Sequence, residues 1–108
     1  MAKRKHYKSI EFDLDTKKLQ EYYNDYRTAY KDIRSFMNKH GYTHRQGSVY
    51  NSKDKLLETD ILVLVDELRE FFPWASTCIK AFDVANIGQQ HSMLMQLQAT
   101  ENEDDFNI

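Results

Sequence analysis

The chain has 108 residues, enough for one domain with a single hydrophobic core but too few for two domains. Hydrophobic residues make up 41% of it, with only one Pro and three Gly, a composition typical of a folded domain rather than a disordered chain. The formal net charge of −2 argues against a strongly basic domain that binds nucleic acid non-specifically, because such binding grows with the number of phosphates neutralised.

Charge is distributed unevenly between the two ends. The start carries four basic residues, Lys3, Arg4, Lys5 and Lys8, and the end carries four acidic residues, Glu101, Glu103, Asp104 and Asp105. The two sets cancel, so any contact with nucleic acid must come from a local patch of the segment between them. We predict a flexible basic arm over residues 1–8, one domain over 9–97 and a disordered acidic tail over 98–108.

No apolar run approaches the roughly 18 residues that indicate a membrane span. The single cysteine, Cys78, has no second cysteine with which to form an internal disulfide. We therefore expect a cytoplasmic protein with no membrane segment.

The first predicted strand covers Ile10 to Leu14, where apolar and polar residues alternate. A period of two sends the three apolar side chains to one face and Asp13 to the other. Asp15-Thr16 then supplies a helix cap, and a longer amphipathic helix follows. Its stripe consists of Tyr26, Ala29, Tyr30, Ile33, Phe36, Met37 and His40, and Gly41 stands where a left-handed C-terminal cap is expected.

The tyrosines of this region, Tyr22, Tyr23, Tyr26 and Tyr30, have a spacing that favours core packing over stacking on nucleic-acid bases.

Residues 42–50 are predicted to form two short strands around Gln46-Gly47, where glycine permits a tight turn or a bulge. Val49 is taken as the apolar, core-facing residue between Ser48 and Tyr50, so parity places Ser48 on the opposite face. If the hairpin and the first strand share a sheet, Asp13 and Ser48 share its uncovered face. The same parity leaves Tyr50 exposed there.

A second helix is predicted from the Thr59-Asp60 cap to about Phe72. The run Ile61 to Val65 alone could be a buried strand, but the residues that follow keep the helical period. The helix is expected to bury Ile61, Leu64, Val65, Leu68, Phe71 and Phe72. Pro73 ends it, Cys78 to Val84 forms the last strand, and Ser92 to Leu97 is left open between a short helix and a further strand.

The predicted order is strand, helix, strand, strand, helix, strand. This is the ferredoxin-like βαββαβ arrangement of the α+β class, an antiparallel sheet with two helices on one face. The other face is left for a ligand or for dimerisation. A core between helices and sheet is expected to hold Ile33, Phe36, Leu64 and Leu68.

Three segments of the chain resemble the virulence-associated protein D (VapD) family. They are Phe12-Asp13-Leu14, the helix segment Ala29-Tyr30-Lys31-Asp32-Ile33-Arg34, and Gln46-Gly47-Ser48-Val49-Tyr50. The resemblance covers about residues 8 to 88. It implies a small ferredoxin-like homodimer with endoribonuclease activity, in some members the toxin of a toxin–antitoxin pair. It also implies a structural relation to the small CRISPR adaptation nucleases, whose Gly-x4-Gln-x-Ser-Val-Tyr/Phe pattern is matched here from Gly41 to Tyr50.

The resemblance further implies that Asp13 and Ser48 belong to the active site. Where family members place a polar or acidic residue in the last strand, this chain has Cys78-Ile79-Lys80-Ala81-Phe82, so no third catalytic residue is assigned. From its own position Asp13 could instead cap the following helix. Alternatively, two Asp13 carboxylates meeting across a dimer axis could share a proton or hold Mg²⁺, for which one protomer supplies too few ligands.

We assign substrate binding to His44, Arg45, Gln46 and Lys80. Arginine or lysine can stabilise charge on a phosphate, and histidine can move a proton near neutral pH. Alternation places His44 and Arg45 on opposite faces. The spacing of His6, His40, His91 and Cys78 matches no zinc motif.

Two functions remain open at this point. One is an endoribonuclease that acts as a homodimer, either with Mg²⁺ or by attack of the RNA 2′-OH without metal. The other is a non-catalytic dimeric module that binds RNA or a protein such as an antitoxin through the same sheet face.

Overall fold

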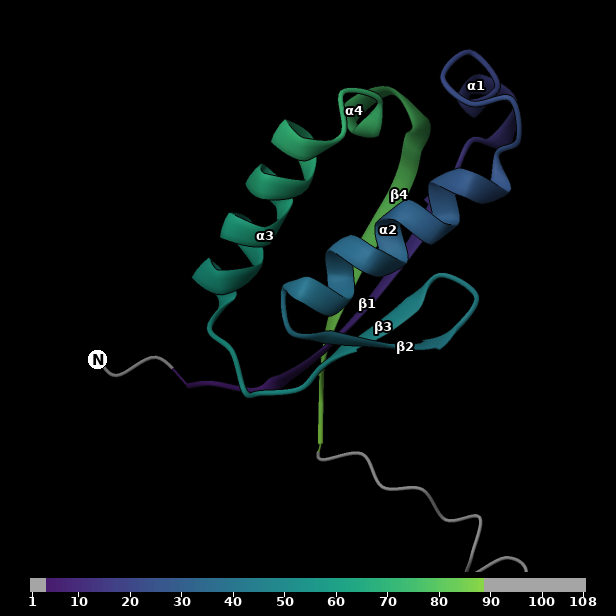
Figure 1. Ribbon diagram of the computed structural model, residues 1–108. Coiled ribbons are helices and arrows are strands. Elements are labelled where there is room, and N and C mark those ends of the chain that lie inside the picture. Colours follow the sequence, from purple (N-terminus) through teal and green to yellow (C-terminus); the bar gives the residue numbers. More distant parts are fainter. Residues whose placement is uncertain (1–3, 89–108) are drawn as a thin grey trace, which may run out of the picture.

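The computed structural model describes residues 4–88, which form one sheet and a layer of helices (Figure 1). In chain order the elements are β1 (Tyr7–Leu14), α1 (Thr16–Leu19), α2 (Arg27–Lys39), β2 (Tyr42–Gln46), β3 (Val49–Ser52), α3 (Glu58–Phe71), α4 (Ala75–Cys78) and β4 (Ile79–Ile87). The strands lie in the order β2-β3-β1-β4, and each neighbouring pair is antiparallel. With α1 and α4 as single turns, this is the predicted ferredoxin-like fold.

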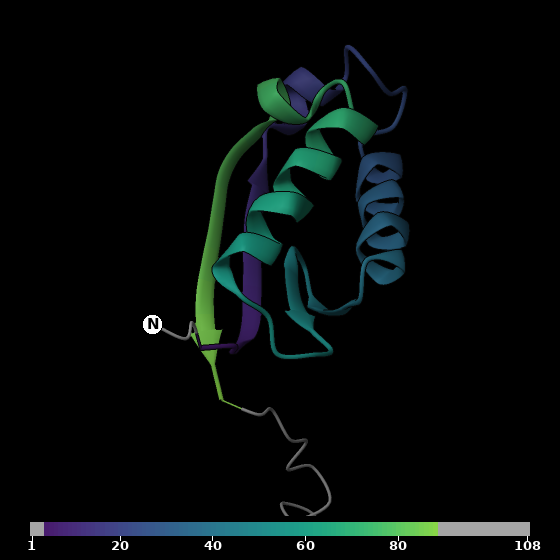
Figure 2. The ribbon, with the colours of Figure 1, turned by 90° about the vertical axis from the view of Figure 1, so that its left-hand side faces the viewer.

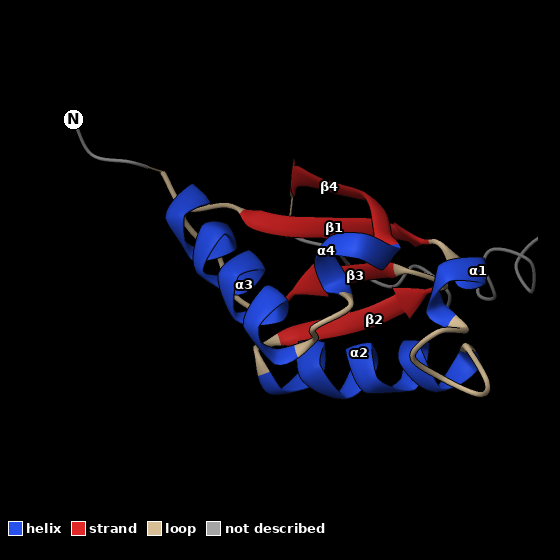
Figure 3. Cartoon of the chain, turned by 90° about the horizontal axis from the view of Figure 1, so that it is seen from above, coloured by secondary structure: helices blue, strands red, loops and turns tan. Residues whose placement is uncertain are grey.

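Both long helices cover the same face of the sheet, as Figure 2 shows in side view. Seen from above, α2 lies along β2 at one side of the sheet (Figure 3). Within residues 4–88 no helix covers the opposite face, which we call the open face. The fold therefore presents one packed side and one side available to a partner or ligand.

The core forms between the sheet and the helices. Ile10, Phe12 and Leu14 of β1 are all buried, and Phe12 stacks on Tyr50 with ring centroids 5.8 Å apart. The helices add Ile33, Phe36, Leu64 and Leu68 to the same cluster. The predicted core is confirmed, and the alternating apolar residues of β1 form its sheet side.

The first strand begins earlier than predicted, at Tyr7. The prediction that Lys8 belongs to a flexible arm is wrong, because its side chain is on the helix side of the sheet and the residue is 0% exposed. Its ammonium donates to Glu58 Oε1 at 2.8 Å and to the side chain of Asn86. The long aliphatic stem lets lysine occupy a core position while its charge reaches a partner, which a pattern of apolar residues does not reveal.

The tyrosine prediction is wrong for two residues. Tyr22 and Tyr26 are 47% and 39% exposed, whereas Tyr23 and Tyr30 are partly buried against the core. Tyr22 and Tyr26 both precede α2, which begins at Arg27, so neither ring belongs to the buried stripe of that helix.

Helix α3 begins at Glu58, one residue before the predicted cap pair, with Leu57 at the N-cap. Asp60 still contributes, because its carboxylate accepts from the Leu57 amide at 2.7 Å. At the other end Phe71 is 67% exposed and Phe72 is buried, so the assignment of Phe71 to the core is wrong. The backbone leaves the helical conformation at Phe72 and becomes extended, and this change directs the Phe72 ring into the core.

The remaining boundaries differ by a few residues. Cys78 ends α4 as a buried free thiol, and β4 runs on to Ile87, three residues beyond the predicted end. Gly41 and Gly47 both have positive φ, as their predicted turn positions require. The predictions for Ser92 to Leu97 and for the acidic tail lie outside the described residues.

No helix in the described part of the chain has both the length and the apolar character needed to cross a membrane.

Candidate functional site

Asp13 lies near the end of β1, on the open face, because its neighbours Phe12 and Leu14 are buried on the helix side. The alternative role as a helix cap falls to Asp15, whose carboxylate accepts from the Lys18 amide at 3.1 Å. The Asp13 side chain is 64% exposed. Its carboxylate is therefore free to act on a ligand.

Lys80 is the cation beside Asp13, with Nζ 3.7 Å from Oδ2. The pairing of β1 with β4 shifts at this point, since Asp13 pairs with Ala81 and Leu14 pairs with Ile79. Lys80 is the extra residue of this bulge, and the bulge places it beside Asp13. Both side chains are more than half exposed, and such surface pairs contribute little to stability, about 0–1 kcal/mol. Either charge can therefore be redirected to a ligand at small cost.

Ser48 lies in the turn between β2 and β3, and its side chain is on the helix side of the sheet. It has the parity of Tyr50, which is buried in the core. The prediction that Ser48 shares the open face with Asp13 is wrong, and so is the exposure predicted for Tyr50, which is 2% exposed. The large Tyr50 ring takes the core position, and Val49, paired with Glu11, takes the open face.

Ser48 nevertheless lies at the same end of the sheet as Asp13. Its carbonyl accepts from the Phe12 amide at 3.2 Å, one residue before Asp13. Burial raises the pKa of Tyr30, and the negative charge of Asp13 raises it further. Tyr30, Ser48 and Asp13 thus gather at one end of the sheet although they come from a helix, a turn and a strand.

His44 and Arg45 lie on opposite faces, as alternation predicts. The His44 ring packs against Tyr50 with centroids 5.0 Å apart, and its Nε2 donates to the Gly47 carbonyl at 2.7 Å. His44 therefore supports the turn that carries Ser48 rather than reaching the open face.

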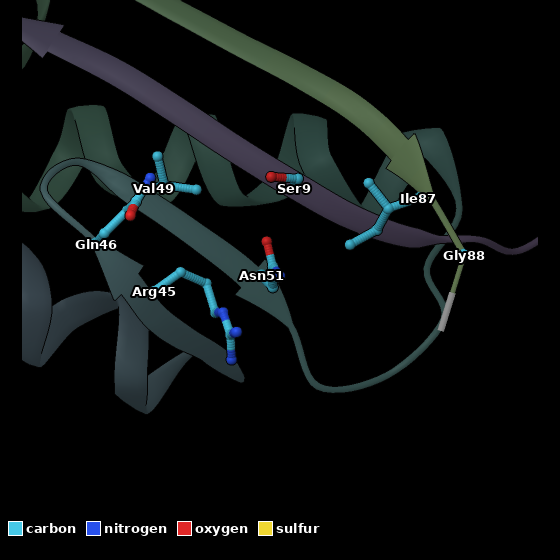
Figure 4. Close-up of a pocket in the computed structure, with 7 residues that line it drawn as sticks. All are labelled: Ser9, Arg45, Gln46, Val49, Asn51, Ile87 and Gly88. Carbon is cyan, nitrogen blue, oxygen red and sulfur yellow. The ribbon is translucent and has the colours of Figure 1, made fainter. Parts of the chain in front are cut away.

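Arg45 and Gln46 both line a hollow of about 500 Å³ on the open face (Figure 4). A register shift allows this, since His44 pairs with Tyr50 and Gln46 with Val49, leaving Arg45 as the extra residue. The lining consists of Ser9, Arg45, Gln46, Val49, Asn51, Ile87 and Gly88. The guanidinium of Arg45 gives this hollow a positive charge suited to a phosphate.

The open face also carries carboxylates that sequence reasoning missed. Glu11 of β1 pairs directly with Asp83 of β4, and both are exposed. The predicted last strand included Asp83, but only the register places it opposite Glu11. Among residues 4–88, no three His, Cys, Asp or Glu side chains lie close enough together to hold a metal ion.

Side chains of α2 also lie close to the hairpin and to the rest of the core. Burial raises the pKa of Tyr50, and the nearby side chain of Arg34 partly lowers it. Asp32 accepts from the Tyr23 hydroxyl at 2.9 Å, and the same hydroxyl accepts from Trp74 Nε1 at 3.0 Å. Asp32 is thereby connected through Tyr23 to the segment after α3.

Two curated proteins are similar to the chain over most of its length. Endoribonuclease VapD 2 of Riemerella anatipestifer is 34% identical over 88 residues, which cover 80% of this chain and 94% of that protein. The endoribonuclease VapD homolog of Helicobacter pylori is 30% identical over 86 residues, covering 80% of this chain and 90% of that protein. No protein-family model matches the chain.

Proposed function

Since the chain belongs to the VapD family of endoribonucleases, we propose that it cleaves RNA at the end of β1 where Asp13 and Lys80 meet. The observation that carries this proposal is the geometry of that pair. An exposed carboxylate stands 3.7 Å from an exposed ammonium on a sheet face that no described helix covers. A proton acceptor and a cation side by side are what cleavage of a phosphodiester requires.

In the metal-free route the reaction uses these two side chains, the RNA and a proton from solvent. The Asp13 carboxylate takes the proton from a ribose 2′-OH, and the 2′-oxygen forms a bond to the adjacent phosphorus. The bond from phosphorus to the 5′-oxygen breaks, and that oxygen takes a proton from solvent. Lys80 stabilises the negative charge that develops on the phosphate. The products are a 2′,3′-cyclic phosphate and a 5′-hydroxyl.

The hollow with Arg45 and Gln46 is the proposed path of the RNA away from the cleaved bond. Arg45 offers a planar donor group to a phosphate, and Gln46 can donate to a base or sugar. Ser48 approaches from the helix side of the same end, where its hydroxyl can donate to a phosphate oxygen. This path explains how a protein with a net charge of −2 could hold RNA locally.

We propose a homodimer in which two open faces meet. Such a contact would involve β4, a long strand at the edge of the sheet, and would leave the hollow beside Arg45 open to RNA. Light scattering on the purified protein is expected to give twice the monomer mass. A monomer at micromolar concentration would contradict the dimer.

The described residues of one protomer do not supply a ligand set for Mg²⁺, because Asp13 is joined by a cation rather than by further carboxylates. Two Asp13 side chains across a dimer axis would supply the oxygen ligands that this ion prefers. A bound Mg²⁺ would lower the pKa of a water molecule and neutralise phosphate charge.

A non-catalytic role is favoured by one observation. Glu11 and Asp83 put two carboxylates on the open face, and these repel the phosphates of RNA. A protein partner with basic residues, such as an antitoxin, would meet them favourably. We also propose a role as a toxin, an antitoxin as the protein partner, and a cytoplasmic location.

The two functions are separated by incubating the purified protein with a labelled single-stranded RNA, with and without EDTA. Cleavage that leaves 2′,3′-cyclic phosphate ends and persists in EDTA supports the metal-free reaction. Cleavage lost in EDTA supports two Asp13 carboxylates around a metal ion. Absence of cleavage under both conditions, with the dimer intact, supports the binding module.

A further inference from the structure

A surface that the proposed function does not use lies on the helix side of the molecule, between the end of α2 and α3. It contains two hollows of about 220 and 310 Å³, and both are lined by His40 and Glu67. We call this surface the α2–α3 groove. The lining residues that define it are His40 at the end of α2, and Asp60, Val63, Glu67, Glu70 and Phe71 of α3.

Three residues of α3 form a ridge along the groove. Val63, Glu67 and Phe71 are each four positions apart, so they lie one above another on the same side of the helix. Val63 is 54% exposed and Phe71 is 67% exposed. The ridge therefore presents two apolar side chains to solvent, about 12 Å apart along the helix axis, with a carboxylate between them.

Contacts with α2 and with the core hold this ridge in place. The Phe71 ring packs against Phe36 and Phe72, with ring centroids 5.5 and 4.9 Å away. Glu67 Oε2 lies 2.5 Å from Nε2 of His40, whose ring stacks on Phe36 with centroids 4.0 Å apart. Because these contacts already order the side chains, a partner would lose little affinity to ordering them.

Charge selects the kind of partner that fits. The groove carries the carboxylates of Asp60, Glu67 and Glu70, and among the described residues that line its hollows none is a lysine or arginine. These carboxylates repel RNA and anionic membranes. A second copy docked by a two-fold axis would bring the same carboxylates face to face. A protein segment that combines apolar and basic residues complements the groove in both respects.

We propose that the α2–α3 groove binds an amphipathic helix of a partner protein. Two apolar side chains of that helix, two turns apart, meet Val63 and Phe71, and a lysine or arginine midway between them meets Glu67. This inference goes beyond the proposed function. The groove lies on the side of the sheet opposite Asp13, so the partner leaves the open face accessible.

The test measures binding of a fluorescently labelled helical peptide to the purified protein by fluorescence anisotropy. The peptide carries two leucines with the spacing of Val63 and Phe71, a lysine midway between them, and alanine and further lysines elsewhere. We expect Phe71→Ser to raise the Kd about 10-fold or more, because it removes an apolar anchor. Val63→Ser, at the other end of the ridge, should also raise it. Glu67→Gln should raise it roughly threefold.

Leu62→Ser is the matched control, because Leu62 is also an exposed apolar residue of α3 but lines neither hollow. It should leave the Kd within about twofold of wild type. A peptide with glutamate in place of every lysine should bind about 10-fold more weakly or worse.

Equal binding by wild type, Phe71→Ser and Val63→Ser would overturn the proposal, and so would equal binding of the two peptides. A Kd raised by Glu11→Gln but not by Phe71→Ser would place the peptide on the open face and would also overturn it. The assay contains no RNA, so its outcome is independent of the proposed cleavage site.

Discussion

The Ser48 carbonyl accepts a hydrogen bond from the Phe12 amide at 3.2 Å, which joins the β2–β3 turn to the end of β1. Phe12 also stacks on Tyr50, two residues after Ser48, with ring centroids 5.8 Å apart. The strand segment and the hairpin segment that both resemble the VapD family are therefore in direct contact. This contact ties the position of the turn to the end of β1 that carries Asp13.

Leu64 and Leu62 of α3 give a matched pair for the packing of that helix. Leu64 is 3% exposed and Leu62 is 63% exposed. Leu64→Ala should lower the free energy of unfolding by about 2–5 kcal/mol, because it removes buried methyl groups and leaves a cavity. Leu62→Ala should change it by less than about 0.5 kcal/mol. Urea unfolding of both variants measures this, and equal effects would show that the helix faces are misassigned.

The Lys8–Glu58 ion pair predicts a dependence of stability on acid pH. The hydrogen bond and charge of Lys8 lower the pKa of Glu58, so the ionised carboxylate stabilises the folded state above the usual glutamate range. This contribution is lost as the pH falls through the lowered pKa. Glu58→Gln should therefore lower the urea midpoint at pH 7, and the gap to wild type should narrow below about pH 4.

The control for this experiment is Glu70→Gln, an exposed glutamate of the same helix. A gap between wild type and Glu58→Gln that does not change with pH would mean that the lost interaction is not the ion pair.

Tyr42 predicts a loss of stability at alkaline pH. Burial, with a smaller contribution from the charge of Asp60, raises its pKa to about 12. Between pH 10 and 12 the unfolded chain ionises at this residue before the folded one does, so stability falls by up to about 2–3 kcal/mol. Tyr42→Phe should flatten the decline of the urea midpoint across this range. Tyr22→Phe, at an exposed position, is the control, and an equal decline in wild type and Tyr42→Phe would contradict the assignment.

Much of the fold could be predicted from the sequence because its periodicities are strong. Alternation in β1 correctly places Asp13 away from the core, and the spacing in α3 correctly distinguishes a helix from a strand. The hairpin could not be read in the same way. Val49 and Tyr50 are adjacent and both apolar, so either can face the core, and only the pairing of Val49 with Glu11 decides between them.

The site was harder to predict than the fold for a related reason. Lys80 reaches Asp13 because the register of β1 and β4 shifts between Asp13 and Leu14, and Asp83 faces Glu11 because of the regular register before that shift. A shift of one residue exchanges the faces of a strand and leaves no signature in a short sequence of mixed residues. Tyr30 could be recognised as part of a motif, but its closeness to Asp13 depends on how α2 packs against the sheet.

The most direct test of the proposed function is the rate of RNA cleavage by Asp13→Asn, with Glu11→Gln as the matched control on the same face of β1. Asparagine has nearly the same shape as aspartate, and the exposed side chain contributes nothing to the core, so the fold should be unchanged. We expect Asp13→Asn to lose on the order of 10²-fold or more in rate, because the group that accepts the 2′-OH proton is gone. Glu11→Gln should remain close to wild type. Cleavage by Asp13→Asn at the wild-type rate, with contaminating nuclease excluded by an unrelated protein purified in the same way, would contradict the assignment of this site.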